Sequence, residues 1–362
     1  ANLTFVDLSE HDLTETNLSG VNLSHAKLSK VTLKGKDLSG ANLTFVDLSE
    51  HDLTETNLSD THLFRTNLSG MDLRYITITN ADFRYADLSE SKLPDSLLAG
   101  NNFDYAILKN INFAGKDLSG SSFQQVELEG SDMQNTNLSD ANFVQVDFTK
   151  IKNKSLAGAD LSEASLAYSD LSGVNLDGVI LHSTNFWNAD LSGVDFTVTD
   201  VITDGLTFIK SNLSNSNFEG VNLSPKESYS QVFQNKAYLM SGATQTPEDE
   251  AMIKKDLFGD HHVLIISAEV RGNDLAVNYI FFNSFANANL VNANFKNASL
   301  ARANFYSADL TNADLSGADL SWAFLLDADL SNTNLEGANL QGVILDNAIL
   351  SNANLKCINH PI

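Results

Sequence analysis

The chain has 362 residues, of which 46 are acidic and 22 basic, and its formal net charge at pH 7 is −24. Direct binding to nucleic acid needs clustered Lys and Arg to neutralise phosphates, so this charge argues against it. No apolar run approaches the ~18 residues of a membrane helix, so no segment is expected to span a bilayer. The single cysteine, Cys357, excludes an internal disulfide framework.

A five-residue period dominates the chain from its first residues. Every fifth position from Leu3 to Phe148 is Leu, Phe, Ile or Met. The phase slips by three residues near 149–155, resumes at Leu156 and runs to Leu206. A second slip, of two residues near 207–210, precedes three more centres that end at Leu223. Because a helix has a period of 3.6 and a strand a period of 2, neither element explains this pattern.

Each apolar centre lies in a recurring motif, for which Ala313-Asp314-Leu315-Ser316-Gly317 is typical. The motif resembles that of the pentapeptide-repeat family, over about 300 of the 362 residues. The resemblance implies an all-β solenoid, a right-handed quadrilateral β-helix in which four pentapeptides form each coil. In that fold the apolar centre and the small residue two positions before it point inward. Residues 1–19 recur unchanged at 41–59, a shift of two whole coils.

The period stops at residues 224–284, which divides the chain into a β-helix over 1–223, an insertion over 224–284 and further coils over 285–362. Ser224–Glu227 resembles a capping box with Pro225 at the first helical position, and predicts a helix to about Met240. Thr246–Asp249 predicts a second helix that ends near Gly259. Two β-branched and aromatic runs, 262–270 and 275–282, flank a turn and predict a hairpin. We therefore expect an ααββ module, for which a loop without a role is the alternative.

No Ser–His–Asp, Cys–His or phosphate-loop pattern is present, so we expect no enzyme activity, no cofactor and no metal site. His261 and His262 stand near Asp256 and Asp260, but adjacent histidines point in different directions. His11 and His51 lie two coils apart, about 10 Å, which is too far to share one ion. We interpret them as surface histidines. Lys36 and Lys116 occupy small inward positions, and we expect their ammonium groups to turn out into solvent.

The distribution of acidic residues along the repeat is informative. When the coils are stacked on one another, the positions before the centres gather on two neighbouring faces. We expect an acidic surface formed by Asp7, Asp47, Asp87, Glu127, Asp147, Asp12, Asp52, Asp72 and Asp132. Mutual repulsion that keeps molecules from clumping is the alternative interpretation of these charges.

Three functions fit the pattern. The first is a rod-like structural protein at the cell surface or outside the cell, which assembles head to tail with itself because its terminal coils have no polar caps. Its interface would consist of Asn2, Leu3, Leu8, Leu13, Leu18, Leu340, Leu345, Leu350 and Leu355. The second is a monomeric adaptor that binds an unknown protein through the 224–284 module. The third, implied by family members that protect DNA gyrase, is a cytoplasmic acidic mimic of DNA, although the insertion and the length depart from those proteins.

Overall fold

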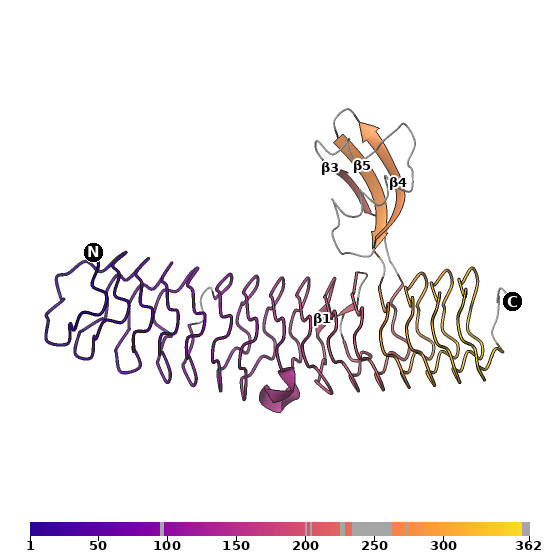
Figure 1. The fold of residues 1–362 in the computed structure, drawn as a ribbon, viewed down its shortest axis with the longest axis horizontal. Helices are drawn as coiled ribbons and strands as arrows, with labels where there is room; N and C mark the ends of the chain where they lie inside the picture. Colours follow the sequence, from indigo (N-terminus) through magenta and orange to yellow (C-terminus); the bar gives the residue numbers. More distant parts are fainter. Residues whose placement is uncertain are drawn as a thin grey trace. The chain divides into compact units, whose positions relative to one another are not determined.

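The computed structural model describes residues 1–94, 98–199, 201–202, 205–224, 229–233, 263–271, 274–281 and 283–356. The chain forms two compact units. The N-terminal unit contains Ala1–Leu181, Ala189–Val194 and Val198–Asp200, and the C-terminal unit contains His182–Asn188, Asp195–Thr197 and Val201–Ile362. Both units are built from successive coils (Figure 1).

The coils pair with one another through the residue that precedes each apolar centre. Asn2 forms a parallel bridge with Asn22, and Asn22 with Asn42, so that each residue pairs with its equivalent in the next coil. The Leu3 N–H donates to the Asn22 carbonyl over 2.7 Å, and the Asn22 N–H donates to the Ala1 carbonyl over 2.9 Å. The main-chain hydrogen bonds that join strands therefore run between coils, which is the arrangement of a parallel β-helix.

A tight turn after the apolar centre, as at Leu3, explains the period of five. The Val6 N–H donates to the Leu3 carbonyl, and Phe5 between them has a φ of 61°. This is the geometry of a type II turn, whose third residue needs a positive φ and therefore favours Gly or Asn. Gly, Asn or Asp occupies this position in many of the coils, with φ between 52° and 73° at residues such as Asn80, Gly130 and Asp140.

The apolar centres form the core of each unit. In the N-terminal unit, Phe83, Phe103, Phe123 and Phe143 stack with their ring centroids 4.7 to 5.0 Å apart. In the C-terminal unit, two columns of phenylalanines stack in the same way and meet edge to face; they are Phe186, Phe208, Phe285 and Phe305 in one column and Phe196, Phe218 and Phe295 in the other.

The first phase slip is an enlarged corner. Two short 3-10 helices, η1 (Phe148–Lys150) and η2 (Lys152–Lys154), accommodate the extra residues. Asn137 there bridges Asp160, three positions further along the chain than in a regular coil. The regular spacing returns with the bridge between Ser155 and Asn175.

The second slip lies earlier than the sequence predicts. The bridges between Asn185 and Thr207 and between Asp195 and Asn217 enclose two residues more than a regular coil, so the extra pair comes before Thr207 and not within 207–210. The expectation that Leu206 is a centre is wrong. Phe208 is the centre, because it stacks on Phe186, and Leu206 fills the small inward position two residues earlier. The two-residue strands β1 (Ile180–Leu181) and β2 (Val201–Ile202) belong to this part of the sequence.

The insertion contains an antiparallel sheet of three strands in the order β3-β5-β4. The strands are β3 (Tyr229–Phe233), β4 (Val263–Arg271) and β5 (Asp274–Phe281). β4 and β5 occupy the two runs for which the sequence predicts a hairpin. The predicted first helix is wrong over Tyr229–Phe233, because pairing with β5 outweighs the local helix signal at Ser224–Glu227. The predicted second helix, 246–259, lies outside the described residues.

The coils continue past the insertion without a change of register. Asn212 bridges Asn289, which lies 77 positions further along the chain, where partners in regular coils lie 20 apart. Asn222 bridges Ser299 in the same way. The buried side chain of Asn283 joins the two ends of the insertion, since its Nδ2 donates to the Leu223 carbonyl over 2.7 Å and its Oδ1 accepts from the Leu206 N–H over 2.8 Å.

Candidate interaction surface

The predicted acidic surface has a structural use in the turns. Eight of its nine residues are aspartates, and each accepts, at Oδ1, the backbone N–H two positions later, over 2.9 to 3.3 Å. Asn17 does the same for Ser19 without a charge. A short polar side chain that bonds the main chain two residues ahead stabilises a turn, and Asp and Asn are equivalent in this role.

Lys and Arg neutralise much of this acidic surface. Six of the nine carboxylates have a cation within 4.0 Å, in the pairs Asp7–Lys27, Asp52–Lys34, Asp72–Arg74, Glu127–Lys109, Asp132–Lys152 and Asp147–Lys150. Hydrogen bonds from the Arg74 side chain lower the pKa of Asp72 to about 2. Those from the hydroxyls of Thr14 and Thr54 hold the pKa of Asp12 and of Asp52 below the usual range.

The predicted assembly residues lie in separate units. In the N-terminal unit, Leu8 and Leu18 are buried, Leu3 and Leu13 are half-buried and Asn2 is exposed. In the C-terminal unit, Leu340 is buried, Leu345 and Leu350 are half-buried and Leu355 is exposed. The centres of the inner coils are far more completely enclosed.

A ladder of aromatic rings runs along one corner of the N-terminal unit. We call it the aromatic edge, and it consists of Phe5, His25, Phe45, Phe64, Tyr85 and Tyr105. The rings of Phe5, His25 and Phe45 stack with centroids 4.5 Å apart, and those of Tyr85 and Tyr105 are 4.6 Å apart and nearly parallel. Phe64 lies between these two stacks, tilted against both of them.

Four of the six rings of the aromatic edge are exposed to solvent, and Phe64 and Tyr105 are half-buried. Phe5 is 73 %, Phe45 43 % and Tyr85 40 % exposed, whereas the stacked phenylalanines of the core are fully buried. Five of its six residues occupy the same turn position of their coils, the one with a positive φ, and only Phe64 precedes that position. Whole coils written beneath one another would have brought this ladder out of the sequence, but the five-residue motif leaves that position variable.

Two guanidinium groups accompany the rings. Arg65 lies over Phe45, Phe64 and Tyr85, 5.3 to 5.7 Å from their centroids. Arg84 lies 6.0 Å from the centroid of Phe64 and donates to both carboxylate oxygens of Asp82, over 2.8 and 2.7 Å. Within the described residues, no carboxylate is within ion-pair distance of Arg65. The edge therefore combines apolar rings with an exposed cation.

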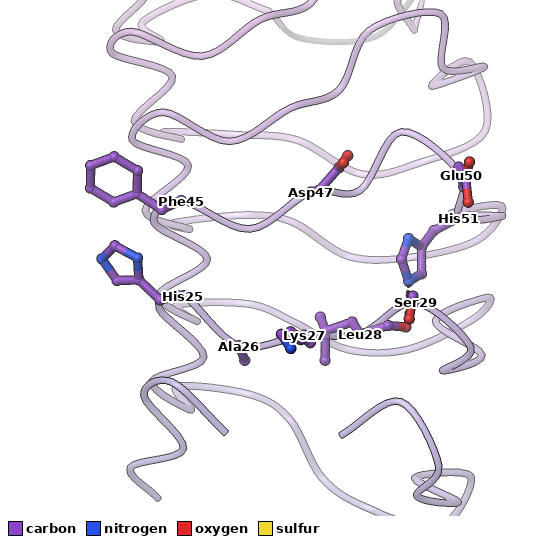
Figure 2. Close-up of a pocket in the computed structure, with 9 residues that line it drawn as sticks. All are labelled: His25, Ala26, Lys27, Leu28, Ser29, Phe45, Asp47, Glu50 and His51. Carbon is purple, nitrogen blue, oxygen red and sulfur yellow. Dashed lines mark hydrogen bonds between the residues drawn. The ribbon is translucent and has the colours of Figure 1, made fainter. Parts of the chain in front are cut away.

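An open groove of about 300 Å³ extends from the aromatic edge across the adjoining face. Figure 2 shows His25 and Phe45 at one end of it and His51 at the other, with Lys27 and Asp47 between. The Nε2 of His51 donates to the Leu28 carbonyl over 2.9 Å, and its Nδ1 is buried without a partner. His51 is thus half-buried and not the surface histidine that the sequence analysis expects.

The two lysines at inward positions do not extend into solvent as expected. The Lys36 ammonium donates to the carbonyls of Thr14 and Thr16, and the Lys116 ammonium donates to the Pro94 carbonyl over 3.1 Å. Both acceptor turns lie one coil earlier. A cation that bonds main-chain carbonyls between coils holds the charge at the corner, where its stem is half-buried.

Across the described ranges, no three His, Cys, Asp or Glu residues are grouped so that they could hold a metal ion. His261 and His262 lie outside those ranges. None of the described helices has the length and apolar character needed to cross a membrane.

A comparison with known protein families identifies the repeat. The sequence pattern described as pentapeptide repeats matches residues 1–149 in overlapping copies, and also 159–197, 284–325 and 325–356, which is well over half of the chain. No curated protein matches the chain significantly.

Several solved structures are similar to the chain. A pentapeptide repeat protein from the Arabidopsis thaliana thylakoid lumen is 42 % identical over 20 % of this chain and 50 % of its own, with a TM-score of 0.20, so the chain spans only half of that protein. QnrB1, a plasmid-mediated fluoroquinolone resistance protein, is 18 % identical over 72 % of this chain and 91 % of its own, with a TM-score of 0.32. HetL, involved in heterocyst differentiation regulation in Nostoc, is 22 % identical over 89 % and 88 %, with a TM-score of 0.14.

Pentapeptide-repeat proteins fold as right-handed β-helices. The coils of four pentapeptides, the parallel bridges between them and the matched repeats agree with one another. The chain belongs to the pentapeptide-repeat family.

Proposed function

We propose that the chain is a non-catalytic scaffold that binds another protein along its aromatic edge. The observation that carries this proposal is the ladder of rings from Phe5 to Tyr105, four of them exposed, with Arg65 beside it. Aromatic residues and Arg are the side chains most enriched where proteins bind one another tightly. Pentapeptide-repeat proteins are in general non-catalytic, which agrees with a binding role.

Stability alone is a poor explanation for these residues. Phe5, His25, Phe45, Arg65 and Tyr85 hold φ values between 53° and 61°. A residue with a Cβ loses about 1–2 kcal/mol in this region, a cost that Gly does not have. Each aromatic stacking pair returns roughly 0.5–1.5 kcal/mol. The ladder thus gains little stability over a ladder of Gly, and contact with a partner accounts for it better.

The proposal can be tested with a photoreactive phenylalanine analogue placed at Phe45. A matched control carries the analogue at Tyr168, which is 44 % exposed and has a φ of 61° at the same turn position of the same unit. We expect a saturable crosslink to another polypeptide from position 45, absent from position 168 and lost in the Arg65→Ala background. Equal crosslinking from both positions would refute the proposal.

End-to-end self-association is a second candidate. It is favoured by the centres Leu13 and Leu345, which are only half-buried. Sedimentation of the chain over a hundredfold concentration range tests it, because stacked coils would give a mass that rises with concentration. A constant monomer mass would exclude it. The acidic mimic of DNA is not favoured by any particular observation, since most of the predicted acidic residues cap turns and pair with Lys or Arg.

A further inference from the structure

We infer that the aromatic edge binds an extended acidic segment of the partner polypeptide, with one carboxylate on Arg65 and others along the ring edges. This inference rests on the proposed function and adds the chemistry of the partner.

The stacking decides which part of each ring a ligand can reach. His25 is stacked on both faces, and Phe45 on one, at centroid distances of 4.5 Å. Ring faces closed in this way cannot stack on a nucleobase, although single-stranded nucleic acids are held by such stacking. The edges of the rings remain exposed. An aromatic ring carries partial positive charge at its edge and negative charge at its face, so the ladder presents its positive side to solvent.

Arg65 adds a full positive charge beside Phe64, where the rings are tilted against one another. The rings of Phe45 and Phe64 meet at 68°, and Phe64 and Tyr85 at 57°, so they surround one guanidinium instead of stacking. A guanidinium offers donors in a planar fork that suits a carboxylate. Arg65 is exposed, and the described part of the chain places no carboxylate on it.

The charges around the edge favour a ligand that runs along it. Arg84 lies beside the rings and is already paired with Asp82. Lys27 lines the groove and is paired with Asp7. Asp47 and Glu50 line the groove that leads away across the face, and they would repel carboxylates there. The unpaired positive charge of the aromatic edge is thus that of Arg65, because Asp104, next to Tyr105 and near Arg84, adds negative charge at the far end of the edge. The net charge of the whole chain is −24.

The length of the aromatic edge sets the length of the peptide segment that can lie along it. Its rings span five coil steps, which is roughly 24 Å at about 4.8 Å per step. An extended peptide covers that distance with about seven or eight residues at ~3.3 Å each. Nucleic acid of the same length fits poorly, because its phosphates would meet only one unpaired arginine and its bases could not stack on ring faces that are already closed, such as both faces of His25.

The experiment is a fluorescence-anisotropy titration of labelled octapeptides with the full chain, at 20 and 150 mM salt. We expect an octa-glutamate peptide to bind and an octa-glutamine peptide not to bind. Binding should weaken with salt, because the contacts are exposed charges. Arg65→Ala should weaken it by about two- to fivefold, in line with the loss of one exposed charge pair. Arg65→Lys keeps the charge without the fork, so its affinity should lie between those of the parent chain and Arg65→Ala.

The matched control is Arg302→Ala, which removes an exposed arginine at the same turn position in the C-terminal unit. It should leave binding unchanged. The inference is overturned if both alanine variants behave alike, if the glutamine peptide binds as tightly, or if octathymidylate binds more tightly than octa-glutamate. If octa-glutamate does not bind while the crosslink from position 45 persists, the scaffold proposal stands and the acidic segment is wrong.

Discussion

The indole ring of Trp322 lies against Gly342, one coil further along. A Cβ on Gly342 would come within 2.5 to 2.8 Å of three ring atoms, and the φ of this glycine is +68°. Gly120 has almost the same φ, +64°, but open space around it. The two glycines therefore separate the effect of backbone conformation from that of packing.

Gly342→Ala is expected to lower stability by about 1 kcal/mol more than Gly120→Ala, which carries only the backbone cost of ~1–2 kcal/mol. Urea denaturation of both variants measures the difference, with a shift in indole emission as the sign that Trp322 has moved. Combining Gly342→Ala with Trp322→Ala should remove the excess. An equal loss of stability in Gly342→Ala and Gly120→Ala would mean that the Trp322 side chain moves aside at no energetic cost.

His51→Val is expected to stabilise the chain by about 1 kcal/mol. The buried Nδ1 of His51 has no partner, and an unsatisfied buried polar atom costs about 1–3 kcal/mol. Val31 fills the same position one coil earlier and is 5 % exposed, so the site accommodates valine. The Leu28 carbonyl keeps its bond from the Val31 N–H when the imidazole is removed. Thermal unfolding measures the change; His11→Val, at an exposed position of the first coil, serves as the control and should show no gain.

Asp72 is expected to stabilise the folded chain above about pH 4 and to lose that contribution between pH 4 and about 2. The side chain of Arg74 donates to its carboxylate over 2.9 and 2.6 Å, and Lys92 lies in the adjacent coil. The pKa of Asp72 is about 2 when folded, below the ~3.9 of an unfolded chain, so protonation favours unfolding as pH falls through this window.

The Asp72→Asn variant isolates this effect, because an amide oxygen can still accept from the Arg74 N–H. The difference in melting temperature between the parent and the variant should be constant above pH 5 and should shrink or reverse by pH 2. A difference that does not change with pH would contradict the assigned pKa.

Asp170→Asn is expected to raise stability by a few tenths of a kcal/mol at low salt. Asp170 bridges Asp147 in one neighbouring coil and Asp190 in the other, and like charges directly opposite one another are destabilising. The amide keeps the bond that Asp170 accepts from the Ser172 N–H over 2.9 Å. The gain in urea midpoint should disappear in 0.5 M salt. Asp170→Ala loses the turn bond and should be about 1 kcal/mol less stable than the Asn variant; the opposite order would exclude the capping role.

The sequence predicts the repeating part of this molecule because one geometric rule governs it. A centre such as Leu43 must be apolar in every coil, and the side chain of Asn42 before it must accept the main-chain N–H of the turn. The five-residue pattern therefore predicts the fold directly. The pattern misplaces Leu206 because two apolar phases overlap there, and only the stacking of Phe208 on Phe186 separates them.

Features that depend on contacts between coils could not be predicted in the same way. The strand at Tyr229–Phe233 depends on its pairing with β5, which a local helix signal does not contain. The aromatic edge depends on rings in successive coils, and Arg65 differs from Arg302 in the three rings whose centroids lie 5.3 to 5.7 Å from its guanidinium.

The closeness of Leu223 and Asn283 has a consequence for how such a chain can change. The main chain leaves the coils after Leu223 and returns to them at Asn283, and one hydrogen bond of 2.7 Å joins these two residues. The coils after the insertion keep their register with those before it. Any folded domain whose two termini lie side by side could therefore be exchanged for the resident one by recombination or by design. The β-helix would carry the new domain with no new contact in its own core.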